Sequence, residues 1–184
     1  ENHYILDAFR ENKQILKNPE CTVHDIGDGV MCIEFQTKGN SIGEGIAKGI
    51  NEAIDLAEKD GWNGIVIGNN DKQFSVGANL MNMGMMAMQK NFDEIEKFLV
   101  GFQKILMRMR TCNVPVVSAT HGFVLGGGLE VSIHCDAGIH ASESYIGLVE
   151  AGVGLIPGGG GTKEMAMRAS DSFNSGDVKM PSLI

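Results

Sequence analysis

Apolar residues recur at helical spacing in several segments of the chain. In residues 43–59 they stand three or four positions apart, which predicts an amphipathic helix with one buried face. These apolar positions are Ile46, Ile50, Ile54 and Ala57. Further helices are expected over residues 3–17, 80–90, 92–110, 129–134 and 163–168. Asn18-Pro19 should end the first of them, because the residue before a proline avoids helical backbone.

Short apolar runs between these helices predict β-strands. The runs are CTVHDI (21–26), VMCIEFQ (30–36), GIVIG (64–68), VPVVSAT (114–120) and AGIHAS (137–142). The first two are joined by Gly-Asp-Gly, which favours a hairpin. Strands then alternate with helices along the chain, so the pattern predicts a mixed α/β fold built in layers.

The helix expected over residues 80–90 is rich in methionine. Its methionines are Met81, Met83, Met85, Met86 and Met88. Methionine fills irregular apolar surfaces, so we expect core packing or pocket lining here rather than a redox or metal role.

The same pattern divides the chain into three parts. Residues 1–20 are expected to be a linker helix, and residues 21–168 the folded core. The polar, turn-rich residues 169–184 are expected to be a flexible tail or a truncated end.

Composition narrows the class of protein. The 184 residues are 43% hydrophobic, which is enough for one domain with a core, and the net charge of −8 argues against nucleic acid or an anionic membrane as partner. No apolar run is long enough to span a membrane, and the first residues show no signal-peptide pattern. The four cysteines are far apart, which indicates reduced thiols and a cytoplasmic protein. They are Cys21, Cys32, Cys112 and Cys135.

Three consecutive glycines stand directly before Leu129 and Glu130, in the stretch VLGGGLE (124–130). Such a run is costly in conformational entropy, and a core does not need it. It lets the backbone turn tightly and approach a ligand, and the first amides of the helix that follows have no internal partner. Those amides can bind an anion or stabilise negative charge that develops during a reaction.

Two further glycine-rich stretches have a similar character. FSVGAN (74–79) follows the predicted strand at 64–68, with Gly77 allowing a turn and the amide of Ala78 free to point inward. Two such amides that converge from different segments form an oxyanion hole. GLVEAGVGLIPGGGG (147–161) contains a second glutamate, Glu150, and two carboxylates in such surroundings can divide into one acid and one base. Each stretch alone is more typical of a structural turn than of a catalytic one, and only their order and spacing together indicate chemistry.

The order FSVGAN, GFVLGGGLE with Cys-Asp downstream, and VEAGVGLIPGGGGT resembles the crotonase (enoyl-CoA hydratase/isomerase) superfamily over roughly residues 21–168. QTKGNSIG (36–43) is similar to an early motif of that family. The chain most resembles the hydratase part of fused 3-hydroxyacyl-CoA dehydrogenase/enoyl-CoA hydratase proteins of fatty-acid oxidation. The resemblance implies an α/β fold with a repeated ββα spiral core, here lacking the C-terminal helical part that closes the acyl pocket and supports trimer assembly.

The resemblance also implies roles for particular residues. The amides of Ala78 and Gly127 would form the oxyanion hole, and Glu130 and Glu150 would be catalytic. Substrate contacts are expected from Lys38, Gly77, Asn79, Leu80 and Gly126. Lys38, with Lys72 as a second candidate, would meet the phosphates of an acyl-CoA.

The implied reaction is hydration of trans-2-enoyl-CoA to 3-hydroxyacyl-CoA in fatty-acid β-oxidation. Glu130 would act chiefly as base on the water and Glu150 would protonate C2. No metal or separate cofactor is implied, since coenzyme A is part of the substrate and NAD would serve only a fused dehydrogenase outside this chain. The intact protein would be a homotrimer or a dimer of trimers.

Several alternatives stay open. The sequence has Asn79 where the family usually has aspartate and Val149 where it usually has proline, so loop geometry could differ. An isomerase would need only one of the two glutamates, and a non-catalytic scaffold would only bind acyl-CoA or a partner. The cluster His134, Cys135, Asp136 and His140 does not fit a metal-ligand spacing. No G-x-G-x-x-G lies between a strand and a helix, which argues against NAD binding here.

Overall fold

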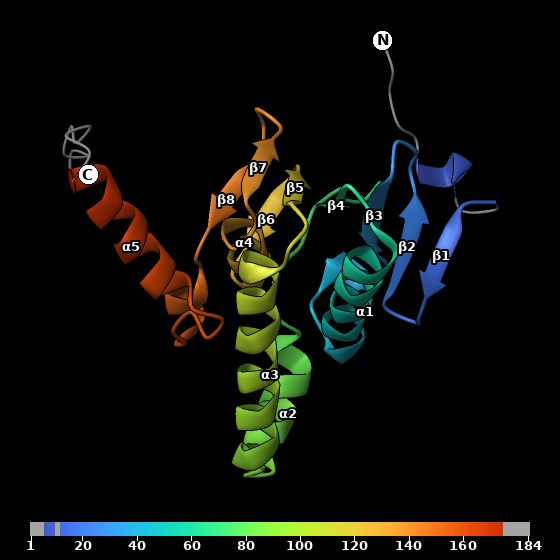
Figure 1. The fold of residues 1–184 in the computed structure, drawn as a ribbon. Coiled ribbons are helices and arrows are strands. Elements are labelled where there is room, and N and C mark those ends of the chain that lie inside the picture. The colour runs from blue at the N-terminus through green and yellow to red at the C-terminus, as the bar shows by residue number, and fades with distance from the viewer. Residues whose placement is uncertain (1–5, 10–11, 175–184) are drawn as a thin grey trace.

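A computed structural model describes residues 6–9 and 12–174 of the chain (Figure 1). The strands are β1 (Gln14–Lys17), β2 (Cys21–Asp25), β3 (Val30–Phe35), β4 (Gly64–Ile67), β5 (Val116–Thr120), β6 (Phe123–Leu125), β7 (Ala137–His140) and β8 (Tyr145–Gly147). The α-helices are α1 (Glu44–Asp60), α2 (Leu80–Met88), α3 (Phe92–Thr111), α4 (Gly127–Ile133) and α5 (Gly161–Asn174). Short 3₁₀ helices are η1 (Leu6–Ala8), η2 (Lys38–Asn40) and η3 (Glu150–Val153).

The main sheet has the strand order β1-β2-β3-β4-β5-β7. Its first three strands are antiparallel and the remaining neighbours are parallel. The hairpin predicted at Gly-Asp-Gly is confirmed, and Gly27, Asp28 and Gly29 all have positive φ there. The five predicted strands are confirmed, because each predicted run contains one strand of this sheet.

A second, smaller layer of strand pairing lies beside the main sheet. β6 pairs with β8 in parallel, and two isolated parallel bridges, Ser75 with Val124 and Ile42 with Ala78, continue the same layer. Successive turns of the chain therefore give one strand to the main sheet, then one extended segment to the second layer, and then a helix. This arrangement confirms the predicted α/β fold with a repeated ββα core.

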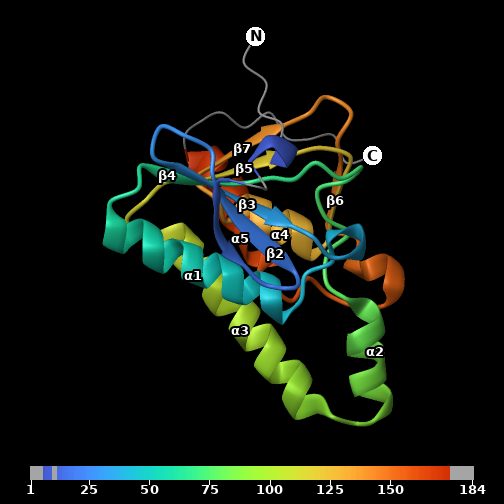
Figure 2. The same ribbon diagram turned by 90° about the vertical axis from the view of Figure 1, so that its right-hand side faces the viewer.

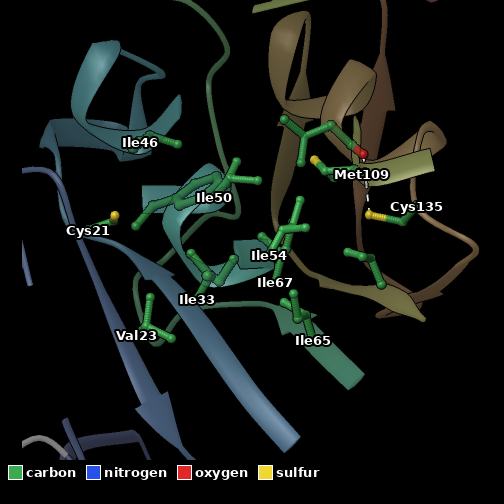
Figure 3. Close-up of a cluster of buried hydrophobic side chains, with 14 of the residues drawn as sticks. Cys21, Val23, Ile33, Ile46, Ile50, Ile54, Ile65, Ile67, Met109 and Cys135 are labelled. Carbon is green, nitrogen blue, oxygen red and sulfur yellow. Dashed lines mark hydrogen bonds between the residues drawn. The ribbon is translucent and has the colours of Figure 1, made fainter. Parts of the chain in front are cut away.

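The hydrophobic core lies between the main sheet and α1 (Figure 3). The face of α1 that carries Ile46, Ile50 and Ile54 packs on strand residues that are almost fully buried. Those strand residues include Cys21, Val23, Ile33, Ile65 and Ile67. Burial of each such side chain contributes about 1.5–3 kcal/mol. The helix predicted over 43–59 is thus confirmed in both its bounds and its buried face.

α2 and α3 form a helical hairpin that extends away from the body of the molecule, while α3 also runs alongside α1 (Figure 2). Both helices are confirmed close to their predicted bounds. The expectation of core packing for the methionines of α2 is wrong, because this helix has no buried residue and Met81 and Met88 are 76% and 85% exposed. Met83 and Met86 instead line a cavity, which is the pocket-lining alternative.

The helix predicted over residues 3–17 is wrong in its second half. Gln14–Lys17 form β1, which pairs antiparallel with β2, and within the described part of the preceding segment only Leu6–Ala8 are helical. The side-chain oxygen of Asn18 accepts hydrogen bonds from the amides of Glu20 and Cys21, so Asn18-Pro19 is the turn of a hairpin rather than the end of a helix. The hydrogen bonds that β1 forms with β2 stabilise these residues more than the loosely spaced apolar residues would stabilise a helix.

The expected flexible tail is also partly wrong. α5 continues to Asn174, because Met165, Ala169 and Phe173 extend a helical spacing that no glycine or proline interrupts. The rest of the expected tail, 175–184, lies outside the described residues. The sequence analysis also missed β6 and β8, since three-residue strands give almost no periodic signal.

In the described part of the chain, no helix combines the length and apolar character that crossing a bilayer requires.

Candidate active site

The segment before α2 brings the amide of Ala78 to the interior. The neighbouring amides donate elsewhere, with Ile42 N–H bound to the carbonyl of Gly77 at 2.8 Å and Asn79 N–H to the carbonyl of Ile42 at 3.4 Å. Gly77 has φ +91, and a Cβ there would lie 3.0 Å from the nitrogen of Gly127. Only glycine therefore allows this turn to approach α4 so closely.

Each of the three glycines before Leu129 lies close to an atom of another segment of the chain. Gly126, with φ +51, begins the turn into α4, and a Cβ on it would lie 3.0 Å from Glu150 Oε1. A Cβ on Gly127 would lie 3.4 Å from the nitrogen of Ala78, and one on Gly128 would lie 2.7 Å from Cβ of Ser75. Glycine is thus required at Gly128 by the close approach of Ser75 and at Gly126 by its positive φ, whereas a Cβ on Gly127 would make an ordinary contact.

The amides of Ala78 and Gly127 converge on one small space. Ala78 comes three residues after Ser75 and Gly127 three residues after Val124, and Ser75 and Val124 are bridged, so the two amides occupy equivalent places in successive turns. Neither amide donates to an acceptor within the described residues. The side chains of Ile42 and Phe102 each lie 3.6 Å from the Cβ position of Gly127 and wall this space with apolar surface. Two unpaired backbone amides side by side are the donors that an oxyanion hole would need.

A buried polar network fixes the segment that carries Ala78. Asn40 is buried with φ +51, and its side-chain amide donates to the carbonyl of Gln73 at 2.9 Å. The hydroxyl of Ser75 donates to the carbonyl of Asn40 at 2.7 Å and accepts from Gly77 N–H at 3.0 Å. The roles of Asn40 and Ser75 were missed by sequence reasoning, although QTKGNSIG contained Asn40 and asparagine is the residue that tolerates positive φ.

Glu130 lies on α4 with its carboxylate held at both oxygens. Oε2 accepts from Gly159 N–H at 3.0 Å and Oε1 from Gly161 N–H at 2.8 Å, and the residue is 2% exposed. Burial raises the pKa of this carboxyl above its ordinary value, the two amides oppose that rise, and the charge of Glu150 adds to it. A carboxylate in this setting has a fixed direction and an increased affinity for a proton.

Glu150 begins η3 and reaches the same region from another turn. Its Oε1 lies against Gly126, the residue whose carbonyl accepts the Glu130 amide at 3.0 Å. Its Oε2 is buried without a hydrogen-bond partner in the described part of the chain. Buried carboxylate oxygens almost always have a partner, so an unsatisfied one beside a second carboxylate points to a ligand atom or a water. The fold therefore brings Ala78, Gly127, Glu130 and Glu150 together.

The other predicted substrate contacts are more dispersed. Lys38 is exposed in η2, next to Gly39, whose carbonyl accepts from Val76 N–H at 3.1 Å, and Lys72 is exposed in the loop before Phe74. Asn79 caps α2 by accepting from Asn82 N–H at 3.2 Å, and Leu80 is 47% exposed at the start of that helix. A cavity of about 240 Å³ lies next to Ile42 and Asn79, and its lining includes Met83, Met86 and Phe98 as well as Glu20, Glu44 and Glu94.

The groups considered for a metal site have other partners. His134 Nδ1 lies 2.7 Å from the carbonyl of Glu130, and His140 Nδ1 lies 2.6 Å from the Thr120 hydroxyl. No cluster of three metal-binding side chains occurs within residues 6–9 and 12–174. The four cysteines are free thiols, and burial raises the pKa of Cys135 to about 12, which makes it an unreactive nucleophile.

Comparison with known proteins agrees with this geometry. The sequence profile of the enoyl-CoA hydratase/isomerase family matches residues 25–175. The chain is 42% identical over 175 residues to the "Probable 3-hydroxyacyl-CoA dehydrogenase" of Bacillus subtilis (strain 168), which covers 92% of the chain but 22% of that relative. It is 36% identical over 102 residues to the short-chain-enoyl-CoA hydratase of Clostridium acetobutylicum, covering 55% of the chain and 38% of that protein. The chain thus spans about a fifth of the length of the Bacillus relative.

Among solved structures, the enoyl-CoA hydratase from Polaromonas sp. JS666 superimposes with a TM-score of 0.76. The match covers 80% of the chain and 58% of that structure at 23% sequence identity. A likeness at this identity establishes a shared fold.

Proposed function

The chain belongs to the enoyl-CoA hydratase/isomerase family, and from that premise we propose that it hydrates trans-2-enoyl-CoA to 3-hydroxyacyl-CoA as a lyase of fatty-acid β-oxidation. The observation that carries this proposal is the convergence of the two unpaired amides of Ala78 and Gly127 beside two carboxylates, those of Glu130 and Glu150.

The two amides stabilise the negative charge of the reaction. The thioester carbonyl oxygen of the substrate lies between the N–H groups of Ala78 and Gly127, and it gains charge as a thioester enolate forms. Because both donors are backbone groups fixed by the turns at Gly77 and Gly126, they need no reorganisation during the step. Each donor of this kind is worth about 3 kcal/mol in the transition state.

The two glutamates act on one water. Glu130, with its direction fixed by two amides, accepts a proton from the water as the water oxygen bonds to C3. Glu150 delivers a proton to C2 as the C2=C3 bond is lost, so that H and OH are added across the bond. The unsatisfied Oε2 of Glu150 supports its contact with the water. Since the two carboxyls influence one another, their protonation belongs to the pair rather than to either residue.

The proposal also assigns residues that bind the rest of the substrate. Gly77, Gly126, Asn79 and Leu80 border the thioester, and the acyl chain is proposed to contact the adaptable side chains of Met83 and Met86, which line a cavity shared with three glutamates. Lys38 is proposed to contact the CoA phosphates. The similarity to a much longer dehydrogenase supports a covalently fused dehydrogenase domain. A homotrimer or a dimer of trimers, a cytoplasmic location and the absence of a separate cofactor remain parts of this proposal.

The proposal is tested with Glu130→Gln and Glu150→Gln in the natural full-length protein. We expect each variant to lower kcat for crotonyl-CoA hydration by at least ~100-fold, because glutamine keeps the shape but exchanges no proton. The double variant should lose less than the product of the single losses, since the two groups work as a unit. CoA-ester affinity should largely survive.

Two other outcomes would contradict the proposal. If one of the two substitutions is harmless and the protein moves a double bond, it is an isomerase, which needs only one proton shuttle. If the wild type binds CoA esters without any turnover, the chain is a non-catalytic binding module.

A further inference from the structure

A buried carboxylate that takes no part in the proposed chemistry lies behind the site. Glu164, in the first turn of α5, is 0% exposed. Its Oε2 forms an ion pair with Arg110 at the end of α3, and its Oε1 lies 3.1 Å from Lys163 Nζ and 3.5 Å from His134 Nε2. Burying a charge costs free energy unless the charge is paired. The presence of this buried charged cluster therefore calls for a structural or functional role.

The segment that Glu164 anchors is the one that holds Glu130. The Glu164 amide donates to the carbonyl of Gly160 at 3.0 Å, and the adjacent amides of Gly159 and Gly161 are those that bind the Glu130 carboxylate. On the other side of the loop, the Gln103 side chain donates to the carbonyl of Gly158 at 2.6 Å. The Arg110–Glu164 pair therefore ties this glycine loop to α3 at one end, and Gln103 ties it at the other.

The cluster also reaches the backbone of Glu130 through His134. A carbonyl oxygen only accepts hydrogen bonds, so Nδ1 of His134, 2.7 Å from the Glu130 carbonyl, must carry the proton. This fixes the imidazole with Nε2 toward Glu164 Oε1. Glu130 is thus connected to Glu164 by its carboxylate through the loop amides, whereas His134 binds the Glu130 carbonyl and only packs its Nε2 against Glu164 Oε1.

We propose that Arg110, Glu164 and His134 form a positioning cluster that holds the Gly158–Gly161 loop, and with it the direction and proton affinity of the Glu130 carboxylate. Its effect on activity rests on the proposed function, whereas its effect on the loop does not.

The charges around Glu164 and His134 agree with this role. Burial acts to raise the pKa of Glu164, but Lys163, His134 and Arg110 together outweigh it and hold the pKa below its ordinary value. Burial lowers the pKa of His134, against the opposing effects of the Glu130 carbonyl and the Glu164 charge. At neutral pH, Glu164 is therefore a carboxylate paired with Arg110 and Lys163, which keeps the loop attached to α3, and His134 is a neutral donor to the Glu130 carbonyl.

The test uses Glu164→Gln in the natural full-length protein, with Arg168→Met as matched control. Arg168 also joins α5 to α4, by donating to the carbonyl of Ile133 at 2.6 Å, but it contacts neither the loop nor Glu130. In Glu164→Gln we expect hydrogen exchange at the Gly159 and Gly161 amides to be at least about tenfold faster. The pKa of Glu130, followed by ¹³C NMR, should rise by about one pH unit as its amide donors loosen. Arg168→Met should leave both unchanged.

Kinetics give a second readout. In Glu164→Gln, kcat should fall about tenfold with KM unchanged, and the acidic limb of the kcat/KM profile should move to higher pH. Should the wild type lack hydratase activity, the proposed function fails, and exchange and titration at Glu130 still decide this inference. If a folded Glu164→Gln variant keeps wild-type exchange and a wild-type Glu130 pKa, or if Arg168→Met changes them equally, the cluster has no positioning role.

A second pair of variants decides the matter if Glu164→Gln does not fold. Arg110 is the partly exposed member of the cluster, with 36% of its side chain accessible, so its replacement disturbs packing less. Arg110→Met should accelerate exchange at Gly159 and Gly161, and Arg110→Lys, which keeps the charge, should restore most of the protection. Unchanged exchange in Arg110→Met overturns the inference.

Discussion

Glu130 and Glu150 are the two carboxylates of the candidate active site, and the structure holds them in different ways. Glu130 stands on α4, is almost completely buried, and gives both carboxylate oxygens to backbone amides. Glu150 begins the short helix η3, whose neighbours Val149 and Val153 are 42% and 58% exposed, and one of its oxygens has no partner among the described residues. One carboxylate is clamped by the protein, and the other is left with an open hydrogen-bonding position.

This difference bears on the proposed division of work, in which Glu130 is the base and Glu150 the acid. A clamped carboxylate with a raised pKa accepts a proton from one fixed direction, which suits activation of a water. In the proposed reaction, the Glu150 carboxyl, which has one unsatisfied oxygen, contacts the water and delivers a proton to C2. The comparison also predicts that Glu130 depends on its surroundings more strongly than Glu150 does, and matched glycine substitutions test that dependence.

The largest effect is expected from Gly159→Ala. The new Cβ would lie 2.6 Å from Glu130 Oε2 and 2.6 Å from the Phe102 ring. Both side chains are buried, and the Glu130 carboxylate is held by two amides. We expect the free energy of unfolding to fall by about 1–3 kcal/mol, and kcat for crotonyl-CoA hydration to fall about 100-fold because Glu130 is displaced. Chemical denaturation and steady-state kinetics measure the two losses.

Gly84→Ala is the control for that variant. Gly84 lies within α2, and a Cβ there meets no atom within 4 Å, so the methyl adds helix propensity without a contact. It should leave kcat unchanged and stability equal or slightly higher. Wild-type kcat in Gly159→Ala would mean that Glu130 is not clamped in the way described.

A smaller effect is expected from Gly126→Ala, which acts on Glu150. The Cβ would lie 3.0 Å from Glu150 Oε1, a contact that the end of a flexible side chain can relieve. The φ of +51 with ψ −122 lies outside the left-handed helical region, and such sparsely populated backbone costs a non-glycine residue about 1–3 kcal/mol. We expect kcat to fall about tenfold. Gly61→Ala, with φ +71 in the left-handed helical region and open space around its Cβ, should lose about 1–2 kcal/mol of stability with full activity. A larger activity loss in Gly126→Ala than in Gly159→Ala would reverse the comparison.

The smallest effect concerns pH and stability. The pKa of Glu130 is raised by burial, so the folded protein binds this proton more tightly than the unfolded chain does. The stability that the group contributes is present below its unfolded pKa and is lost as pH rises through the folded pKa. The difference in unfolding free energy between wild type and Glu130→Gln should therefore shift in favour of wild type as pH is lowered.

Urea denaturation over a series of pH values measures this slope. The slope should shrink when Glu150→Gln is the common background, because the charge of Glu150 contributes to raising the pKa of Glu130. A flat difference, or one that favours the wild type only at high pH, would contradict the buried position of Glu130.

Sequence reasoning identified the chemical groups of the site and the turns that expose them. Gly77 and Gly126 announce positive φ and close approach, and Ala78, Gly127, Glu130 and Glu150 follow from the motifs that contain them. Strong helical periodicity also predicted α1 within a residue or two at each end. These features are local, so a single stretch of sequence contains all the information that specifies them.

Other features are invisible to local reading because their partners are distant in the sequence. β1 exists only because β2 pairs with it, and its own residues were read as helix. Likewise, the methionines of α2 form an apolar pattern that local reading assigns to the core. The helix lies on a projecting hairpin instead, because α3 packs against α1. A periodic pattern tells which face is apolar, but not which surface that face will meet.

The sequence by itself determined the glycine turns and the place of the two glutamates within three motifs, and the order of those motifs gave the resemblance that implies the roles of these residues. Only the tertiary structure decided how they are held. Glu130 receives its amides from Gly159 and Gly161, Asn40 braces the turn of Ala78, and Arg110 meets Glu164 across two helices. Hydrogen bonds and ion pairs between distant segments form only when packing brings those segments within about 3 Å, and no local pattern encodes that distance.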